Sequence, residues 1–395
     1  MISFDEASAR IAAAASPLER EKVALDSAHR RVLAAPVLSR RDSPAADSSA
    51  MDGFAVRSID LEPLPARLRI VGESAPARGH GGAIGAGECV RILTGGPLPE
   101  GADRIVVQEI VRREGDVAVI ETPPGPSAFV RRRGHDFLAG QLLVEAGRSL
   151  DPTALVAIAG GDVATIDVVR RPRLAMFTCG DELVAPGEAH GRPGAIPDSI
   201  AAGLAALAGT WGGEIALRER LPDRLETMVA AADRALGAAD LLVIAGGASV
   251  GDRDFARAML EPHGLALDFS RVAVRPGMPT WFGRARGTLV LGLPGNPSSA
   301  IAMARLFLAP LLCGLSGRPT ADALAWRTAR LATPIGECDR RETFARGRAV
   351  GDAVEILSNQ DSSAQATLAA ADLLVRRRPH APVAWAGETV EVLTL

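Results

Sequence analysis

The feature that most constrains the fold is an alternation of apolar strands with helices, which begins after R-R-P-R at residues 170–173. The strand-like segments are L-A-M-F-T, E-I-A-L-R, L-L-V-I-A and T-L-V-L-G-L, and segments with helical periodicity separate them. Strands that alternate with helices form a parallel sheet that is covered by helices on both faces. The sequence therefore predicts an α/β fold, with a long apolar helix from about residue 297 to residue 313.

The rest of the chain has a different texture, which predicts further domains. Short β-rich runs alternate with glycine and proline turns in the first third of the chain and again in its tail. Acids near the N-terminus predict a first helix, and Asp151 followed by Pro152 predicts a second. The predicted parts are a small segment-built linking domain (23–45 and 141–170), an inserted β domain (46–140), an α/β domain (1–22 and 171–325) and a C-terminal β domain (326–395).

Composition limits the classes of function. The chain has 395 residues and a formal net charge of -3, which argues against a nucleic-acid binder because such proteins usually carry a basic face. Its start, M-I-S-F-D-E, places acids where a signal peptide needs cations. We expect no apolar run that approaches the roughly 20 residues of a membrane helix. The expected location is cytoplasmic, with neither nucleic acid nor membrane as a partner.

Cysteine and lysine usage carry two further expectations. The four cysteines form no C-x-x-C pair, so buried free thiols are expected rather than disulfides or a zinc site. Six histidines without an H-x-x-x-H pattern also argue against protein-held zinc. Lys22 is the only lysine, so an arginine where a lysine would serve is weak evidence of selection.

Glycines and acids follow the third predicted strand, in L-L-V-I-A-G-G-A-S-V-G-D-R-D-F at residues 241–255. Ligands of open parallel sheets bind outside the carboxyl ends of the strands, and glycine loops there can bind an anion through backbone N–H groups. Two carboxylates beside a phosphate predict Mg²⁺, which prefers oxygen ligands. The candidate residues are Gly246, Gly247, Ser249, Gly251, Asp252 and Asp254. A tight turn with solvated acids is the alternative.

Two more strand ends add to the same predicted edge. L-V-L-G-L-P-G-N-P-S-S-A, at residues 289–300, leads from a strand directly into a helix that Asn296 can cap, after Pro294 and Gly295. F-T-C-G-D-E-L-V places Glu182 on the same edge. Turn chemistry explains each residue singly, but these loops together with R-P-G-M-P favour an anion site.

The fourth motif, S-S-A-M-D-G-F-A-V at residues 48–56, contains Asp52 and completes a family pattern. The chain resembles the molybdopterin molybdenumtransferase family, MoeA and the gephyrin E domain. The resemblance rests on S-x-x-M-D-G-F-A, T-G-x-P-x-P-x-G-A-D, R-x-x-G-x-D, T-x-G-D-E-L, G-G-x-S-x-G-D-x-D-F and G-L-P-G-N-P-x-S. These motifs cover essentially the whole chain.

The resemblance implies an activity and a set of site residues. Members of this family insert molybdate into adenylylated molybdopterin and release AMP, assisted by Mg²⁺, and they are homodimers. The resemblance places Asp52, Thr94 and Asp136 in the cleft from the partner subunit, and Ser249, Glu182, Asp252 and Asp254 around the pterin and its metal. The molybdopterin adenylyltransferase and cofactor-receiving enzymes are the protein partners that it implies.

The molybdate loop of the family, K-P-G-K-P, is altered here to V-R-P-G-M-P. Arg275 retains the first charge and Met278 removes the second. A unit charge about 4 Å from another is worth roughly 4 kcal/mol at an effective dielectric near 20, before solvent reduces it. The resemblance adds Pro279, Ser299, Arg346 and either Ser363 or Ser362 to the site, and Arg284 and Arg286 are candidates to replace the missing charge.

A second departure is P-D-S-I in place of a D-S-N element, where Ile200 lacks the hydrogen bonds of an asparagine. Three hypotheses remain: an active transferase with an altered molybdate pocket, a divergent paralogue that carries molybdopterin or its cofactor without efficient insertion, and an unrelated nucleotide-pyrophosphate hydrolase. The acidic edge favours the first. Met278 and Ile200 favour the second, and the M-D-G-F motif opposes the third.

Overall fold

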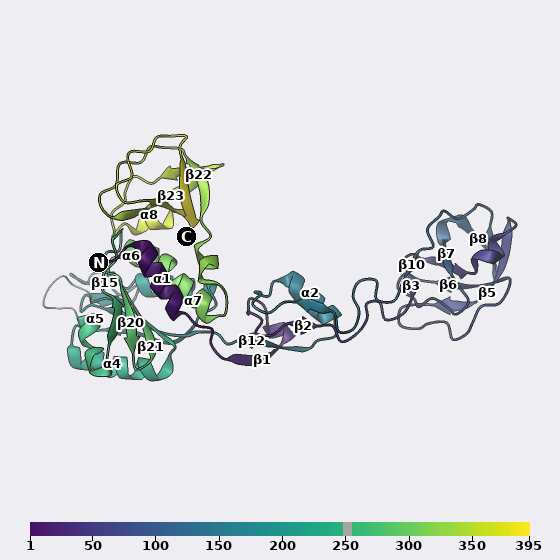
Figure 1. The fold of residues 1–395 in the computed structure, drawn as a ribbon, viewed down its shortest axis with the longest axis horizontal. Helices are drawn as coiled ribbons and strands as arrows, with labels where there is room; N and C mark the ends of the chain where they lie inside the picture. The colour runs from purple at the N-terminus through teal and green to yellow at the C-terminus, as the bar shows by residue number, and fades with distance from the viewer. Residues whose placement is uncertain (248–254) are drawn as a thin grey trace. The chain divides into compact units, whose positions relative to one another are not determined.

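The computed structural model describes residues 1–247 and 255–395 (Figure 1). Within it the chain forms two compact units. Unit 1 contains Met1–Glu21, Arg30–Ala34 and Asp167–Leu395, and unit 2 contains Lys22–His29 and Ala35–Ile166. The finer division into four domains stays a prediction.

A six-stranded sheet organises the first part of unit 1. Its order is β16 (Glu214–Leu221), β13 (Arg173–Cys179), β17 (Leu241–Gly246), β21 (Thr288–Leu293), β20 (Trp281–Ala285) and β18 (Ala266–Phe269). The first four strands run parallel, as predicted. The last two are antiparallel to their neighbours, so the sheet is mixed. The predicted α/β class is confirmed, and the antiparallel edge is an addition to it.

Alternate residues along these strands enter two cores on opposite faces of the sheet, because side chains of a strand point to opposite sides in turn. Leu174 and Met176 pack with α1 (Phe4–Ala14) and α3 (Ile200–Thr210), whereas Phe177 packs with α4 (Leu225–Ala238). Helices therefore cover both faces. The first core also contains Phe344, Leu374 and Leu393, which belong to the C-terminal strands described below.

The long apolar helix spans Pro297–Leu315. It consists of α6 (Pro297–Met303), a π-helical turn (Ala304–Leu308) and α7 (Ala309–Leu315). Its 19 residues are long and apolar enough to cross a membrane, so the expectation that no apolar run approaches that length was wrong. The stretch is 94% buried in the described structure, as the core helix of a globular fold would be.

The C-terminal strands close into a ring. β22 (Arg327–Leu331), β24 (Ala353–Ile356), β23 (Glu342–Val350), β25 (Leu373–Arg377) and β26 (Thr389–Thr394) pair in sequence, and β26 returns to β22. One more strand, β19 (Val274–Arg275), joins this ring by parallel pairing with β23. It comes from the loop that leads into β20, so the C-terminal ring includes a segment from the middle of the chain.

Unit 2 contains a further six-stranded sheet, in agreement with the β-rich texture of its sequence. Its order is β7 (Arg104–Val107), β4 (Gly53–Val56), β6 (Glu88–Ile92), β5 (Ala66–Ser74), β9 (Val117–Ile120) and β8 (Val111–Glu114). The predicted helix α2 (Pro152–Gly160) is present, and the Ala154 N–H donates to the Asp151 side chain at 2.7 Å. The remaining short elements of the chain are β1 (Arg20–Ala24), β2 (Val37–Leu38), β3 (Ser48–Ser49), β10 (Val130–Arg131), β11 (Leu142–Val144), β12 (Thr165–Val169), β14 (Leu183–Val184), β15 (Ile196–Pro197), α5 (Phe255–Ala258) and α8 (Gln365–Ala369).

The cysteines are free thiols, as predicted, and they differ in accessibility. Cys89, Cys179 and Cys313 are buried, and Cys338 is half-buried. Burial raises the pKa of the Cys89 and Cys179 thiols to about 12. Since the thiolate is the reactive form, these two thiols are protected twice, by burial and by protonation.

We expect one fast-reacting thiol when the native protein is titrated with an aromatic disulfide reagent at pH 8, and four after denaturation. Cys338 is the expected site, so Cys338→Ser should remove the fast phase. Any fast-reacting thiol that remains in the native Cys338→Ser variant would contradict this burial pattern.

Candidate functional site

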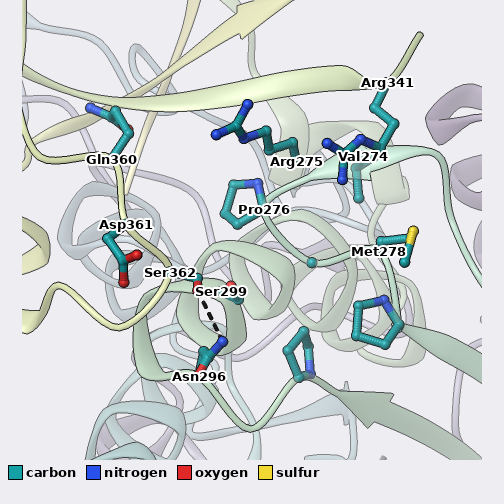
Figure 2. A pocket seen from close by; sticks show the side chains of 13 residues that line it. Val274, Arg275, Pro276, Met278, Asn296, Ser299, Arg341, Gln360, Asp361 and Ser362 are labelled. Atoms are coloured by element: carbon teal, nitrogen blue, oxygen red, sulfur yellow. Dashed lines mark hydrogen bonds between the residues drawn. The ribbon is translucent and has the colours of Figure 1, made fainter. Parts of the chain in front are cut away.

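A pocket of about 310 Å³ lies within unit 1, where four segments meet (Figure 2). One segment is β19 with the loop that follows it, and the second is the N-terminus of α6 with the turn before it. The third follows β24 in the C-terminal ring, and the fourth is Arg341, directly before β23. The residues that line the pocket are Val274, Arg275, Pro276, Gly277, Met278, Pro279, Pro294, Asn296, Ser299, Arg341, Gln360, Asp361 and Ser362.

Strand pairing and one glycine fix the loop of this pocket. β19 pairs with the start of β23, and the Glu342 N–H donates to the Ala273 carbonyl at 2.9 Å. Gly277 has a φ of +104°, and a Cβ at this position would lie 2.3 Å from the Met303 Cγ. The Thr280 hydroxyl donates to the Gly277 carbonyl at 2.7 Å. The turn therefore requires glycine, both for its backbone conformation and for its close approach to the long helix.

Hydrogen bonds fasten the opposite wall to the C-terminal ring. The Asn296 side-chain amide donates to the Ser362 hydroxyl at 2.9 Å, and the Ser298 N–H donates to the Ser362 carbonyl at 3.1 Å. The Ser298 hydroxyl donates to the Ala364 carbonyl at 3.1 Å. The first turn of the Pro297–Leu315 helix thus faces the pocket, and the positive end of a helix dipole favours an anion there.

Two arginines are the most prominent of the remaining polar side chains that line the pocket. Figure 2 shows Arg275 and Arg341 on one side of the pocket and Asn296, Ser299 and Ser362 on the other. Asp361 lines the pocket too, and the Ser363 hydroxyl and N–H donate to its carboxylate, which lowers its pKa. Two guanidinium groups, hydroxyls and a helix N-terminus form a combination suited to an oxyanion.

A further cation lies behind the wall of the pocket. Arg346 is only 1% exposed, and its Nε and Nη1 atoms have no hydrogen-bond partner in the part of the chain that the structure describes. Burial lowers the pKa of this guanidinium, while the charge of Asp361 opposes that effect. Gln360 exchanges hydrogen bonds with the backbone of Arg346, at 2.8 and 2.9 Å, and also lines the pocket.

The structure brings together most of the residues predicted for the oxyanion. Arg275, Met278, Pro279, Pro294, Asn296 and Ser299 all line the pocket. Of the two candidate serines, Ser362 lines the pocket, whereas the hydroxyl of Ser363 is engaged by Asp361 at 2.6 Å. The geometry therefore favours Ser362 over Ser363. Arg341, Gln360 and Asp361 are pocket residues that the sequence interpretation did not name.

The two arginines expected to replace the lost loop charge lie elsewhere. Arg284 donates to the Ala14 carbonyl at 3.1 Å, and Arg286 pairs with Asp233 at 2.6 Å. Both line a different pocket, on the side of the sheet where β20 and β21 are joined. They lie at the end of β20 that is farther from the Arg275 loop, so the expectation that they replace the missing charge was wrong.

The glycine loops at the carboxyl ends of the strands lie close together. A Cβ on Gly246 would lie 2.8 Å from the Cys179 carbonyl oxygen, and one on Gly295 would lie 3.3 Å from the Gly246 Cα. Gly247 has a φ of +66°, which glycine adopts without strain. Such approaches bring the ends of β13, β17 and β21 to one edge, as the sequence predicts.

The predicted metal ligands are only partly described. Glu182 is exposed after β13, and its carboxylate lies over Gly180, within 2.7 Å of where a Cβ would be. Ser249, Gly251, Asp252 and Asp254 lie outside the described residues. Among residues 1–247 and 255–395, no group of three or more His, Cys, Asp or Glu side chains could hold a metal ion. The carboxylate of Glu182 has the oxygen chemistry that Mg²⁺ prefers.

Ile200 is a core residue. It is 8% exposed in the first turn of α3 and packs in the apolar core with Leu204. The neighbouring Asp198 accepts a hydrogen bond from the Thr178 hydroxyl at 2.8 Å and one from the Ala201 N–H at 3.2 Å. The burial of Ile200 among apolar neighbours explains why this position holds an isoleucine.

In unit 2, two of the predicted residues meet. The Thr94 N–H and hydroxyl both donate to Asp52, each at 2.7 Å, and these bonds lower the pKa of the Asp52 carboxyl. Asp136 is exposed, and its N–H donates to the Ser43 carbonyl at 2.9 Å. The described structure has no hydrogen bond between Asp136 and this pair. The M-D-G-F motif thus fixes a carboxylate by hydrogen bonding to Thr94.

The fold and the pocket define an α/β protein in which arginines and hydroxyls line a pocket shared between its sheet and a C-terminal β ring. Comparison with known proteins gives the family. The chain matches the models of the MoeA N-terminal region (domain I and II) over residues 2–160, of a probable molybdopterin binding domain over 175–313, and of the MoeA C-terminal region (domain IV) over 328–395.

Individual relatives agree with these matches. The chain is 33% identical to a molybdopterin molybdenumtransferase of Nostoc sp., over 84% of this chain and 78% of that protein, and 32% identical to one of Haemophilus influenzae, over 83% and 82%. A solved molybdopterin biosynthesis MoeA protein of Pyrococcus horikoshii has a TM-score of 0.84 at 28% identity, covering 100% of this chain and 99% of that one. This chain belongs to the molybdopterin molybdenumtransferase family.

Proposed function

We propose that this protein inserts molybdate into adenylylated molybdopterin and releases AMP, as a transferase of molybdenum cofactor biosynthesis. The observation that carries the proposal is the pocket, whose cations and hydroxyls fit a tetrahedral oxyanion, in a chain of this family. Arg275 and Arg341 offset the negative charge of molybdate, while Ser299 and Ser362 orient its oxygens. Family membership opposes the unrelated hydrolase, and neither the described structure nor the comparisons favour the carrier.

The reaction also needs groups at the edge of the parallel strands. We propose that Gly246, Gly247 and Gly251 bind the anionic substrate by backbone N–H groups, with Ser249 beside them. Glu182, Asp252 and Asp254 would hold Mg²⁺, which would supply Lewis-acid stabilisation of the phosphate when AMP leaves. Asp52, Thr94 and Asp136 are proposed to act on the substrate from the β domain.

Location and assembly are proposed on the family resemblance. The protein is proposed to act in the cytoplasm as a homodimer, with small-molecule substrates. Its proposed protein partners are the enzyme that adenylylates molybdopterin and the enzymes that receive the cofactor. Nucleic acid and membranes have no part in the proposal.

The decisive experiment measures AMP release from adenylylated molybdopterin with Mg²⁺ while molybdate is titrated. We expect Met278→Lys to lower the half-saturating molybdate concentration by roughly tenfold, since it adds a cation to the pocket wall. Wild-type protein that binds the pterin but releases no AMP at any molybdate concentration would support the carrier instead. Val156→Lys is the control, because Val156 is an exposed apolar residue of α2 outside the proposed site.

A further inference from the structure

We propose that Arg218 and Arg220, on the edge strand β16, form a binding site for a phosphoanhydride, the linkage that joins two phosphate groups. Both arginines line a pocket of about 390 Å³ within unit 1. The other residues that line it are Ala185, Pro186, Asp198 and Glu219. Adenylylated molybdopterin and free nucleoside diphosphates both contain such a linkage. The inference rests on the proposed function only where the substrate is the source of the ligand.

The alternation of side chains along β16 directs both arginines to the same face of the α/β sheet. β16 lies at one edge of this sheet, beside β13. Leu221 is buried in the core with α4, and Glu219 pairs with Arg234 of α4 at 2.8 Å. Because successive side chains of a strand point to opposite faces, Arg218 and Arg220 point to the other face, which α3 covers.

The guanidinium groups of this pocket are available to a ligand. Among residues 1–247 and 255–395, neither forms a hydrogen bond or an ion pair. Asp198 also lines the pocket, but it is 4% exposed, and its carboxylate accepts hydrogen bonds from the Thr178 hydroxyl and the Ala201 N–H at 2.8 and 3.2 Å. The other acid, Glu219, pairs with α4 on the opposite face. Two cations without a counter-ion therefore remain on the α3 side.

The spacing of the two arginines indicates the class of ligand. Residues two apart on a strand lie roughly 6.6 Å from each other, so the two like charges repel, and an anion between them removes that repulsion. Each guanidinium is a planar fork that binds two oxygens of a phosphate, so two forks suit two joined phosphate groups.

The position of the arginines in the sheet supports a ligand site. Arg220 is the last residue but one of β16, and it pairs across the parallel ladder with Thr178, near the end of β13. Open parallel sheets bind their ligands at the carboxyl ends of the strands. The two cations therefore stand near the edge where the glycine loops gather, on a strand that lies outside those motifs.

The test measures the dissociation constants of inorganic diphosphate and of ADP by calorimetry on the full-length protein. We expect Arg218→Gln and Arg220→Gln each to raise both constants at least roughly tenfold, because each removes charge-assisted hydrogen bonds. Arg234→Gln is the matched control, since Arg234 is an exposed arginine that pairs with Glu219 on the opposite face of the sheet. Arg218 and Arg220 are exposed, so these variants should fold, and thermal melting checks this.

The half-saturating concentration of adenylylated molybdopterin for AMP release distinguishes the two sources of the ligand. If Arg218→Gln and Arg220→Gln raise it, the ligand is the substrate. If only the constants of diphosphate and ADP rise, the ligand is a free nucleoside diphosphate.

The outcomes also separate this inference from the proposed function. Wild-type values of all three quantities in both arginine variants, while AMP release continues, overturn the site and leave the proposed function standing. A wild type that releases no AMP overturns the proposed function, and the constants of diphosphate and ADP then decide the site alone: a rise in the arginine variants supports it, and no rise overturns it.

Discussion

Replacing Glu342 by alanine is expected to lower the free energy of unfolding by about 3 to 5 kcal/mol, because it removes the buried counter-ion of the Arg376 guanidinium and leaves only the exposed Asp5 as its partner. Arg376 and Glu342 are each 5% exposed in their side chains, and Arg376 also pairs with Asp5 of α1 at 2.6 Å. The Arg376 guanidinium lies 4.9 Å from the ring centre of Phe4 and 5.2 Å from that of Trp326. These contacts join α1, the C-terminal ring and the start of β23.

Urea denaturation of the full-length protein measures this effect. Glu355→Ala is the matched control, since Glu355 pairs with Arg348 at 2.6 Å on the same ring but is 35% exposed. We expect the control to lose at most about 1 kcal/mol. Equal losses of unfolding free energy in Glu342→Ala and Glu355→Ala would contradict this prediction. They would mean that Arg376 does not depend on Glu342 as a buried counter-ion. The double variant Glu342→Ala, Arg376→Met should recover part of the loss, because it removes the unpaired charge.

Arg275→Gln is expected to raise the half-saturating molybdate concentration for AMP release by roughly 30-fold. The full interaction of two unit charges at about 4 Å is roughly 4 kcal/mol at an effective dielectric near 20, and solvent at this exposed side chain is taken to halve it. Glutamine retains a polar amide with two N–H donors in place of five, so the change reports the loss of the charged guanidinium fork.

Two measurements make the Arg275→Gln result specific. Affinity for the adenylylated pterin should stay near the wild-type value, and Arg284→Gln, outside the pocket, should leave the molybdate dependence unchanged. A variant that loses pterin and molybdate affinity together would indicate a damaged loop instead. Because β19 carries Arg275 into the ring, thermal melting should accompany both assays.

The sequence predicts β13, β17 and β21 well because each contains an apolar run and leads into a loop with glycine. It does not predict the antiparallel edge: β20 reads W-F-G-R-A, where glycine and arginine interrupt the pattern. Its strand character comes from pairing with β21 and from Trp281, which is fully buried against Gly292. Tertiary packing decides such segments more than local preference does.

The residues of the pocket also differ in whether the sequence could identify them. Arg275 and Ser299 belong to contiguous motifs, so the sequence and its family resemblance could identify them. Arg341 could not be found by that route, because it reaches the pocket only through the pairing of β19 with β23, between segments far apart in the chain. Ile200 shows another limit: the sequence marks it as a departure from the D-S-N element, and only the structure shows that it is buried in the core.

The membership of β19 in the C-terminal ring has a thermodynamic consequence. The chain leaves the ring after Arg275 and enters the α/β sheet at Trp281, so an anion in this turn touches both substructures at once. A ligand that binds only the closed arrangement resists its opening, by about 2.7 kcal/mol at a concentration one hundred times its dissociation constant. Anion binding in the pocket and the stability of the contact between the ring and the sheet are therefore linked. A measurement of one gives information on the other.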